Sequence, residues 1–258
     1  MSGAETILAE PREPSRLRRW VAHAGVLVAL AILLALGTWQ VERLHWKQGI
    51  IDTIEARLGA APMPIAAIAR VAAETGDVDY RPAVAAGRFL NAEERFFLST
   101  HEGQAGWNVY VPMVLDEGQG ILFVNRGFVP YERKDPATRR EGQGEGSTEV
   151  RGLARNERPS QSGWFVPEND PGKNVFFWAD LDDLSAGLDP ADRQRVLPFL
   201  LDAGPGAAPG GWPVGGTTIV DVPNNHLQYA ITWYGLALTL AVMYGGFLVK
   251  RWRRPATP

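Results

Sequence analysis

The chain contains no cysteine at all. An external domain of this protein is therefore built without disulfides, and thiolate copper sites, Cys-x-x-Cys redox motifs and Cys-x-x-Cys-His haem attachment are excluded. Formal charge is also missing from two long stretches, residues 20–41 and 222–249, which contain no Asp, Glu, Lys or Arg. Internal repeats are absent too, so a solenoid or a propeller is not expected.

Both charge-free stretches have the properties of transmembrane helices. The apolar part of the second, residues 230–249, is about twenty residues long, which as a helix crosses ~30 Å of hydrocarbon. A cleaved signal peptide is the alternative for the first stretch, because Arg16, Arg18 and Arg19 precede it and residues 35–37 resemble a cleavage site. Its apolar run exceeds the ~7 to 15 residues of a signal peptide, however, and the tryptophans Trp39 and Trp46 are typical of interfacial anchors.

The basic residues predict the orientation. Four arginines precede the first stretch and four basic residues follow the second, whereas the part between them has 18 basic and 26 acidic residues. We therefore predict a cytoplasmic tail at 1–19, a transmembrane helix at 20–41, a periplasmic domain at 42–226, a second transmembrane helix at 227–249 and a cytoplasmic tail at 250–258. The acidic residues Glu5, Glu10 and Glu13 are unlike a mitochondrial transit peptide, which favours a bacterial inner membrane.

The part between the two spans is predicted to be rich in β-structure. Apolar residues recur at steps of three and four from Val41 to Leu58, which extends the first helix into a stalk that ends at Gly59, and a second helix is expected at 65–74. Alternating runs predict strands at 83–90, 95–99, 107–115, 120–129, 148–155, 174–179, 199–201 and 217–222. Residues 116–120 are typical of a hairpin turn, and residues 204–216 of an irregular loop. The expected fold is α+β and mainly antiparallel, either a sandwich or a partly closed barrel.

Sequence signatures of catalysis are missing. His101-Glu102 does not continue to His-Glu-x-x-His, no Gly-x-Ser-x-Gly is present, and residues 142–146 lack the Lys-Ser/Thr of a phosphate loop. The acidic run at 180–183 is better explained as the start of a helix through Leu184, capped by Asp180, than as a cation site. An enzyme is therefore not expected.

Four motifs, in order along the chain, resemble the surfeit locus protein one family. They are LGTWQVER at 36–43, VNRGFVP at 124–130, FVPEN at 165–169 and NHLQYAITWYGL at 225–236. With the two-span layout, the resemblance covers residues 35–248. It implies an assembly factor for cytochrome c oxidase that binds haem a and assists its insertion into the catalytic subunit. The alternative is a haem-free scaffold that stabilises oxidase subunits.

The second span offers a site for this cofactor. His226, Tyr229 or Ala230, Trp233, Ala237, Leu240 and Tyr244 fall on one helical face. Neutral imidazole is a good axial ligand for haem iron, so His226 is the expected metal ligand, with Tyr229 and Trp233 lining the ring. For His226 the alternative is a helix cap or a hydrogen bond to a neighbour, and for Trp233 it is ordinary helix packing.

Arg126 is the fourth candidate for cofactor binding, because a guanidinium pairs bidentately with carboxylates such as the haem propionates. It follows a buried-type strand in an Asn-Arg-Gly turn, where an internal salt bridge is the alternative. The expected partners are the oxidase catalytic subunit, the lipid bilayer, haem a synthase and a second copy of the chain; nucleic acid is not among them.

Overall fold

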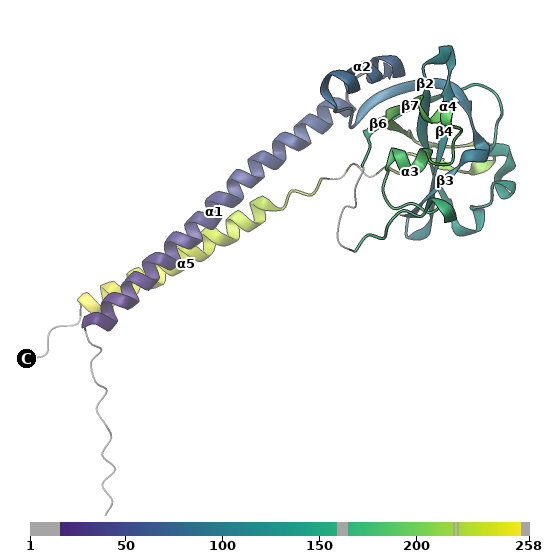
Figure 1. Cartoon of the computed structure of the whole chain (residues 1–258). Helices are drawn as coiled ribbons and strands as arrows, with labels where there is room; N and C mark the ends of the chain where they lie inside the picture. The colour runs from purple at the N-terminus through teal and green to yellow at the C-terminus, as the bar shows by residue number, and fades with distance from the viewer. Residues whose placement is uncertain (1–15, 159–164, 219, 221, 254–258) are drawn as a thin grey trace, which may run out of the picture. The chain divides into compact units, whose positions relative to one another are not determined.

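A computed structural model describes residues 16–158, 165–218, 220 and 222–253. The chain divides into two compact units, Thr53–Asp221 in one and Met1–Asp52 with Val222–Pro258 in the other. The first unit holds the strands and the second the two long helices (Figure 1).

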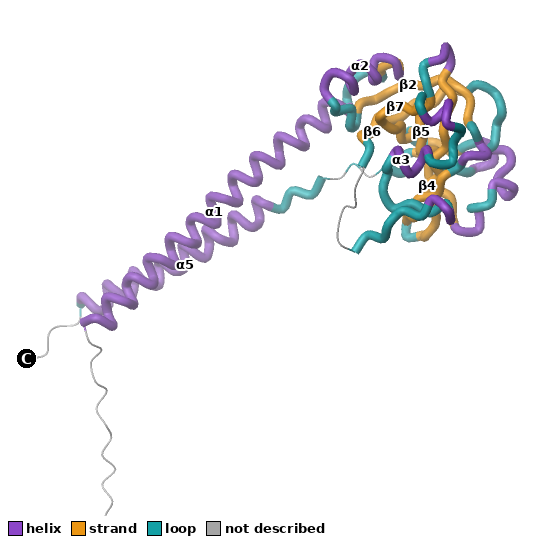
Figure 2. Tube along the Cα trace, viewed as in Figure 1, coloured by secondary structure: helices purple, strands orange, loops and turns teal. Residues whose placement is uncertain are grey.

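The helix pair consists of most of α1 (Arg16–Leu58) and all of α5 (His226–Trp252). Both helices are long and apolar enough to cross a membrane. Within this unit they lie side by side (Figure 2). The buried residues of the two helices are Gly37, Gln40, Ala230 and Ala237. The α1 helix ends before Gly59, as the sequence predicts, because glycine is a poor helix former and Pro62 follows within a turn.

The domain unit contains the remaining elements. Its helices are α2 (Ile65–Thr75), α3 (Leu181–Ser185) and α4 (Pro190–Arg193), and its strands are β1 (Met63–Pro64), β2 (Arg81–Phe89), β3 (Arg95–His101), β4 (Gln104–Leu115), β5 (Ile121–Pro130), β6 (Thr148–Asn156), β7 (Val196–Ala203), β8 (Gly206–Ala207) and β9 (Val214–Gly215). Short 3-10 turns occur at Asn91–Glu93, Asp116–Gly118, Tyr131–Arg133, Pro136–Gly142, Pro171–Lys173 and Pro209–Gly211.

Five of the strands close into a barrel. The pairings run from β2 to β4, β5, β7, β6 and back to β2, and all are antiparallel except β5 with β7. The β3 strand extends the sheet beside β4, and β9 joins β5. Of the two architectures that the sequence left open, the barrel is the correct one, because β6 and β7 join the edges that would remain open in a sandwich.

The β5 strand is buried on both faces, which explains its nearly continuous apolar sequence. On β5, Leu122 and Val124 face the interior core with Phe199 and Leu201 of β7. The intervening Phe123 joins an outer cluster with Phe97, Phe176, Leu181, Leu184 and Leu200. Asp180 caps α3 by accepting hydrogen bonds from the backbone N–H groups of Asp182 and Asp183, as the sequence predicts.

Two predicted strands are wrong. Residues 174–179 form only isolated bridges, such as Phe97 with Phe176, because Asn174 takes a left-handed conformation (φ 53°) and the Asp180 cap follows immediately. The described residues of 217–222 form no strand, and positions 219 and 221 lie outside the described part. Here Thr218 is held through its hydroxyl, which donates to the Asp202 carboxylate at 2.8 Å, rather than through a backbone ladder.

Two further expectations need correction. The Asn-Arg-Gly segment is not a turn, since β5 continues to Pro130 and Gly127 at φ 110° lets the Val214 backbone approach closely. The segment 204–216, expected to be irregular, contains the short pair β8 and β9. The hairpin at 116–120 is confirmed, because the turn Asp116–Gly118 joins the antiparallel strands β4 and β5.

Candidate functional site

His226 is the first residue of α5 and is held by a buried polar residue of α1. Its Nδ1 atom lies 2.7 Å from the Oε1 atom of Gln40, and Gln40 is buried within the helix pair. An amide oxygen only accepts hydrogen bonds, so this contact places the imidazole proton on Nδ1. The lone pair is then on Nε2, the arrangement that metal-ligating histidines adopt when their other nitrogen is anchored. The imidazole therefore fits the role of axial ligand to a haem iron.

The predicted stripe on α5 is the face that packs within the helix pair. Ala230 and Ala237 are buried, and Trp233 is half-buried on the same face. Tyr229, by contrast, is 55% exposed. Ala230 rather than Tyr229 is therefore the stripe residue one turn after His226, and Tyr229 lies on its outer flank.

Sequence reasoning missed the α1 side of this site. Gly37 leaves room for the ring of Tyr234, because a Cβ atom at Gly37 would lie 2.8 Å from that ring. The Thr38 and Tyr234 hydroxyls are 3.1 Å apart. Gly37, Thr38 and Gln40 all belong to the motif at 36–43. The sequence reveals this motif, but it does not reveal that the motif packs against α5.

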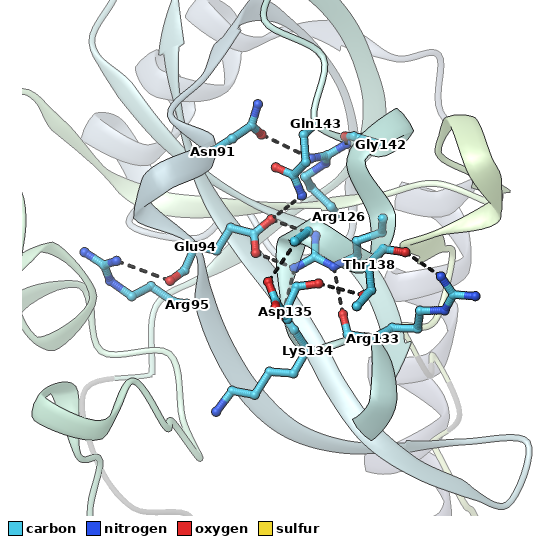
Figure 3. A network of polar contacts seen from close by, with 12 residues as sticks. Asn91, Glu94, Arg95, Arg126, Arg133, Lys134, Asp135, Thr138, Gly142 and Gln143 are labelled. Atoms are coloured by element: carbon cyan, nitrogen blue, oxygen red, sulfur yellow. Dashed lines mark hydrogen bonds and ion pairs between the residues drawn. The ribbon is translucent and has the colours of Figure 1, made fainter.

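Arg126 lies in the domain unit, within β5, and its guanidinium has partners there. Nη2 donates to the Gly142 backbone oxygen at 2.6 Å and Nη1 to Asn91 Oδ1 at 3.3 Å (Figure 3). The guanidinium carbon lies 4.5 Å from the centre of the Phe89 ring. These partners are neutral, and Arg126 forms no salt bridge with the described residues, so the internal salt bridge considered for it is not observed there.

A buried ion pair lies beside Arg126. Arg139 binds both carboxylate oxygens of Glu94, with Nη1 to Oε1 at 2.7 Å. Gln143 donates to the same Oε1 at 2.9 Å (Figure 3). Burial lowers the pKa of Arg126; the Glu94 carboxylate opposes this effect and the Arg139 cation adds to it. The buried Arg139 and the half-buried Arg126 thus lie near the same carboxylate, and only Arg139 is hydrogen-bonded to it, so the Arg126 guanidinium is the one that an anionic ligand would pair with.

Arg126 also lines a cavity of about 710 Å³ at the mouth of the barrel. Phe89, Val124, Val150 and Ala203 form its apolar inner part, and the glycine-rich segments around Gly142 and Gly206 form its rim. Barrel mouths with a few polar groups are typical ligand sites. Arg126 and His226 belong to different compact units, and each site is described by itself.

The outer face of the barrel carries a second, polar cavity of about 340 Å³. At its base Asp202 accepts hydrogen bonds from Asn125 Nδ2 at 3.0 Å, Thr218 at 2.8 Å and Arg155 at 3.3 Å. Burial raises the pKa of the Tyr110 phenol beside it, which keeps the phenol protonated. The Asp202 carboxylate is fully engaged by these donors, so this cluster stabilises the barrel wall.

Within the described ranges, no group of three or more His, Cys, Asp or Glu side chains could hold a metal ion. The chain thus has two parts, a pair of long apolar helices with one anchored imidazole and a closed β-barrel domain with one half-buried arginine, and these two side chains are its candidate binding groups.

Comparison with known proteins assigns the family. The SURF1 family model matches residues 27–238, so the chain belongs to the SURF1 family. It is 32% identical to the surfeit locus protein 1 of Rattus norvegicus, over 97% of this chain and 81% of that protein. The protein of the same name from Homo sapiens is also 32% identical, over 94% of this chain and 81% of that protein. A SURF1-like protein of Monosiga brevicollis is 35% identical, over 84% of each chain.

Proposed function

We propose that this protein is a membrane-anchored assembly factor for cytochrome c oxidase, which binds haem a and assists its insertion into the catalytic subunit. Membership of the SURF1 family supports the assembly role. The observation that carries the haem proposal is the anchored imidazole of His226, whose Nδ1 is engaged by Gln40 at 2.7 Å. The chain acts as a carrier and not as an enzyme.

We place the protein in the bacterial inner membrane, with α1 and α5 as its two spans, both termini in the cytoplasm and the barrel domain in the periplasm. The length and apolar composition of the two helices support this placement. The basic residues at both ends of the chain favour the orientation. His226 then lies where α5 enters the membrane on the periplasmic side.

The residues around His226 have separate tasks in this proposal. Gln40 orients the imidazole and keeps its Nε2 lone pair outward, and His226 is partly exposed, so a ligand can reach it from outside the pair. Trp233 lies about 10 Å further along α5, by the rise of an α-helix, and Tyr229 offers an exposed ring. When bound, haem a supplies an iron that accepts a nitrogen ligand and an apolar tail that suits the lipid-facing surface.

Arg126 is proposed, by itself, as a contact to a haem propionate in the barrel domain. Its half-buried guanidinium has neutral hydrogen-bond partners, with the Glu94 carboxylate and the Arg139 cation nearby. Arg126→Gln should weaken haem binding, and because it changes no candidate iron ligand, the bound spectrum should keep its form. Arg151→Gln, which removes an exposed arginine of the same cavity rim, is the matched control.

The competing function is that of a haem-free scaffold for the oxidase subunits. One observation favours it: Ala230 and Ala237, expected to face the macrocycle, are buried within the helix pair. Haem a synthase and a second copy of the chain are further proposed partners. The two functions differ in whether the protein purified from cells that make haem a carries pigment.

The deciding experiment is an optical spectrum of the purified parent protein and of two variants. His226→Ala removes the imidazole, whereas His226→Asn keeps a polar side chain but is a poor iron ligand. If His226 ligates iron, both variants lose or alter the haem spectrum while they still accumulate in the membrane. If His226 only caps the start of α5, the His226→Asn variant behaves like the parent, and the His226→Ala variant accumulates to a lower level. An unchanged haem spectrum in both variants rejects ligation by His226 and favours the scaffold.

A further inference from the structure

The helix pair contains a cavity of its own, far along both helices from His226. It has a volume of about 470 Å³ and lies between the first turns of α1 and the last turns of α5. Three arginines line it, Arg18 and Arg19 from α1 and Arg251 from α5. Ala22, Val26 and Phe247 form an apolar floor, and His23 and Tyr244 complete the lining. The cavity thus combines a cationic rim with an apolar floor.

A polar pair connects the two helices at this cavity. The Nδ1 atom of His23 and the hydroxyl of Tyr244 are hydrogen-bonded, and their rings meet edge to face with centroids 5.7 Å apart. Tyr244 in turn stacks near Phe247, with ring centroids 6.5 Å apart. These contacts hold the ends of α1 and α5 together and therefore fix the arginines of both helices around one space.

The described residues of the two helices supply no carboxylate to neutralise Arg19 and Arg251. From Arg16 to Val41, α1 contains no Asp or Glu, and α5 contains none over its whole length. Arginine and lysine nevertheless gather at this end, where Lys250 and Arg253 flank Arg251. The charge of the site therefore favours an anionic ligand from outside the pair.

We propose that this cavity binds the phosphate headgroup of an anionic phospholipid. Guanidinium groups bind phosphate bidentately, and basic pockets between membrane helices are suited to anionic headgroups. The apolar floor continues into exposed apolar residues, since Phe247 is 54% and Val21 63% exposed, and such a surface suits acyl chains. A soluble phosphate would use the arginines but not this floor. The inference rests on the membrane placement proposed above, and not on haem binding.

The test measures headgroup preference. The full chain is reconstituted in nanodiscs that contain equal amounts of phosphatidylglycerol and phosphatidylcholine, and the lipids retained after extraction are counted by native mass spectrometry. The parent protein should retain phosphatidylglycerol in preference to phosphatidylcholine. Glycerol 3-phosphate, added in excess, should not displace it; displacement would overturn the lipid as the source of the phosphate.

Charge-preserving variants separate a built site from general surface attraction. The double variant Arg19→Lys, Arg251→Lys keeps every charge, and hence the membrane orientation, but loses bidentate geometry. Its preference for phosphatidylglycerol over phosphatidylcholine should fall about fivefold, equivalent to about 1 kcal/mol. Lys250→Gln removes a charge next to Arg251 but outside the cavity lining, and should change the preference less. An unchanged preference in the double variant, or an equal loss in Lys250→Gln, would overturn the proposal.

Two further measurements keep the outcome clear. Arg251→Lys alone, at an exposed helix end, replaces the double variant if circular dichroism shows that the latter has lost helix content. The haem spectrum is recorded on the same preparations. Retained phosphatidylglycerol in a protein without pigment would reject the haem proposal alone, whereas pigment without headgroup preference would reject the lipid site alone.

Discussion

The imidazole of His226 and the side-chain amide of Gln40 form a hydrogen bond of 2.7 Å between the two apolar helices. The two residues are 186 positions apart in the sequence, yet each belongs to one of the motifs that resemble the SURF1 family. The contact sets which nitrogen of the imidazole can bind a ligand. It also ties α5 to α1 at the point where α5 begins.

Gln40→Leu should weaken haem binding although it leaves His226 in place. Without its acceptor, the imidazole is free to rotate and to change tautomer, and losses of this kind typically cost ~10 to 100-fold in metal affinity. Haem titration of the purified variant, followed optically, measures the change. Gln48→Leu, a substitution of the same type at an exposed position of α1, should bind haem like the parent. Equal affinity in both variants would show that Gln40 does not position the ligand.

Gly37→Ala should loosen the helix pair. The added methyl would lie 2.8 Å from the Tyr234 ring, and overpacking typically costs ~1 to 3 kcal/mol. Gly25→Ala is the matched control, because a Cβ atom there meets nothing within 4 Å. It should be neutral or stabilising by up to ~1 kcal/mol, since alanine favours helix. The unfolding temperature in detergent should therefore fall for Gly37→Ala and stay level or rise for Gly25→Ala, and a stabilised Gly37→Ala variant would contradict the packing.

Phe123→Asp should prevent stable accumulation of the protein. Phe123 is fully buried in the outer cluster of the barrel, so the substitution places an unpaired charge in the core. Val124→Asp, on the interior side of the same strand, should have the same result. Leu98→Asp on β3 is the control, because Leu98 is 46% exposed. Immunoblots of membrane fractions measure the levels, and normal accumulation of Phe123→Asp would mean that β5 is not central.

The stability of the domain should fall in acid through Asp77. The hydrogen bond from Arg57, opposed by burial, lowers the pKa of Asp77 to about 2. The folded pKa thus lies below the unfolded value of ~3.9, so the stabilisation is present above about pH 4 and disappears as the pH falls to about 2. The difference in unfolding free energy between the parent and Asp77→Asn should shrink over this range. A difference that is constant from pH 5 to pH 2 would contradict the assignment.

Reporter fusions should reveal the proposed orientation. A reporter that is active only in the periplasm should be active when it is fused near Gln143 in the domain, and silent when it is fused at Pro258. The basic residues on the cytoplasmic flanks are the physical reason. Activity at Pro258 would overturn the placement of both helices as spans.

Much of the local structure could be predicted from the sequence. The two charge-free stretches, the helical period from Val41 to Leu58 and the cap at Asp180 all correspond to observed helices. These features depend on neighbours within a few residues, so composition and spacing are sufficient to reveal them. The strands with alternating or continuous apolar runs were predictable for the same reason.

Only the tertiary structure decided which of these elements meet. The barrel closes because β5 pairs in parallel with β7, and no local signal identifies partners so far apart in the chain. Burial on both faces hides the alternation in β5, which is why Arg126 was expected in a turn and lies within the strand. His226 was recognisable from its motif, but its tautomer depends on Gln40 of another helix. The sequence by itself determined the helices, most strands and the candidate imidazole, while long-range packing decided the closed barrel and the orientation of the ligand, because both depend on contacts that local periodicity does not encode.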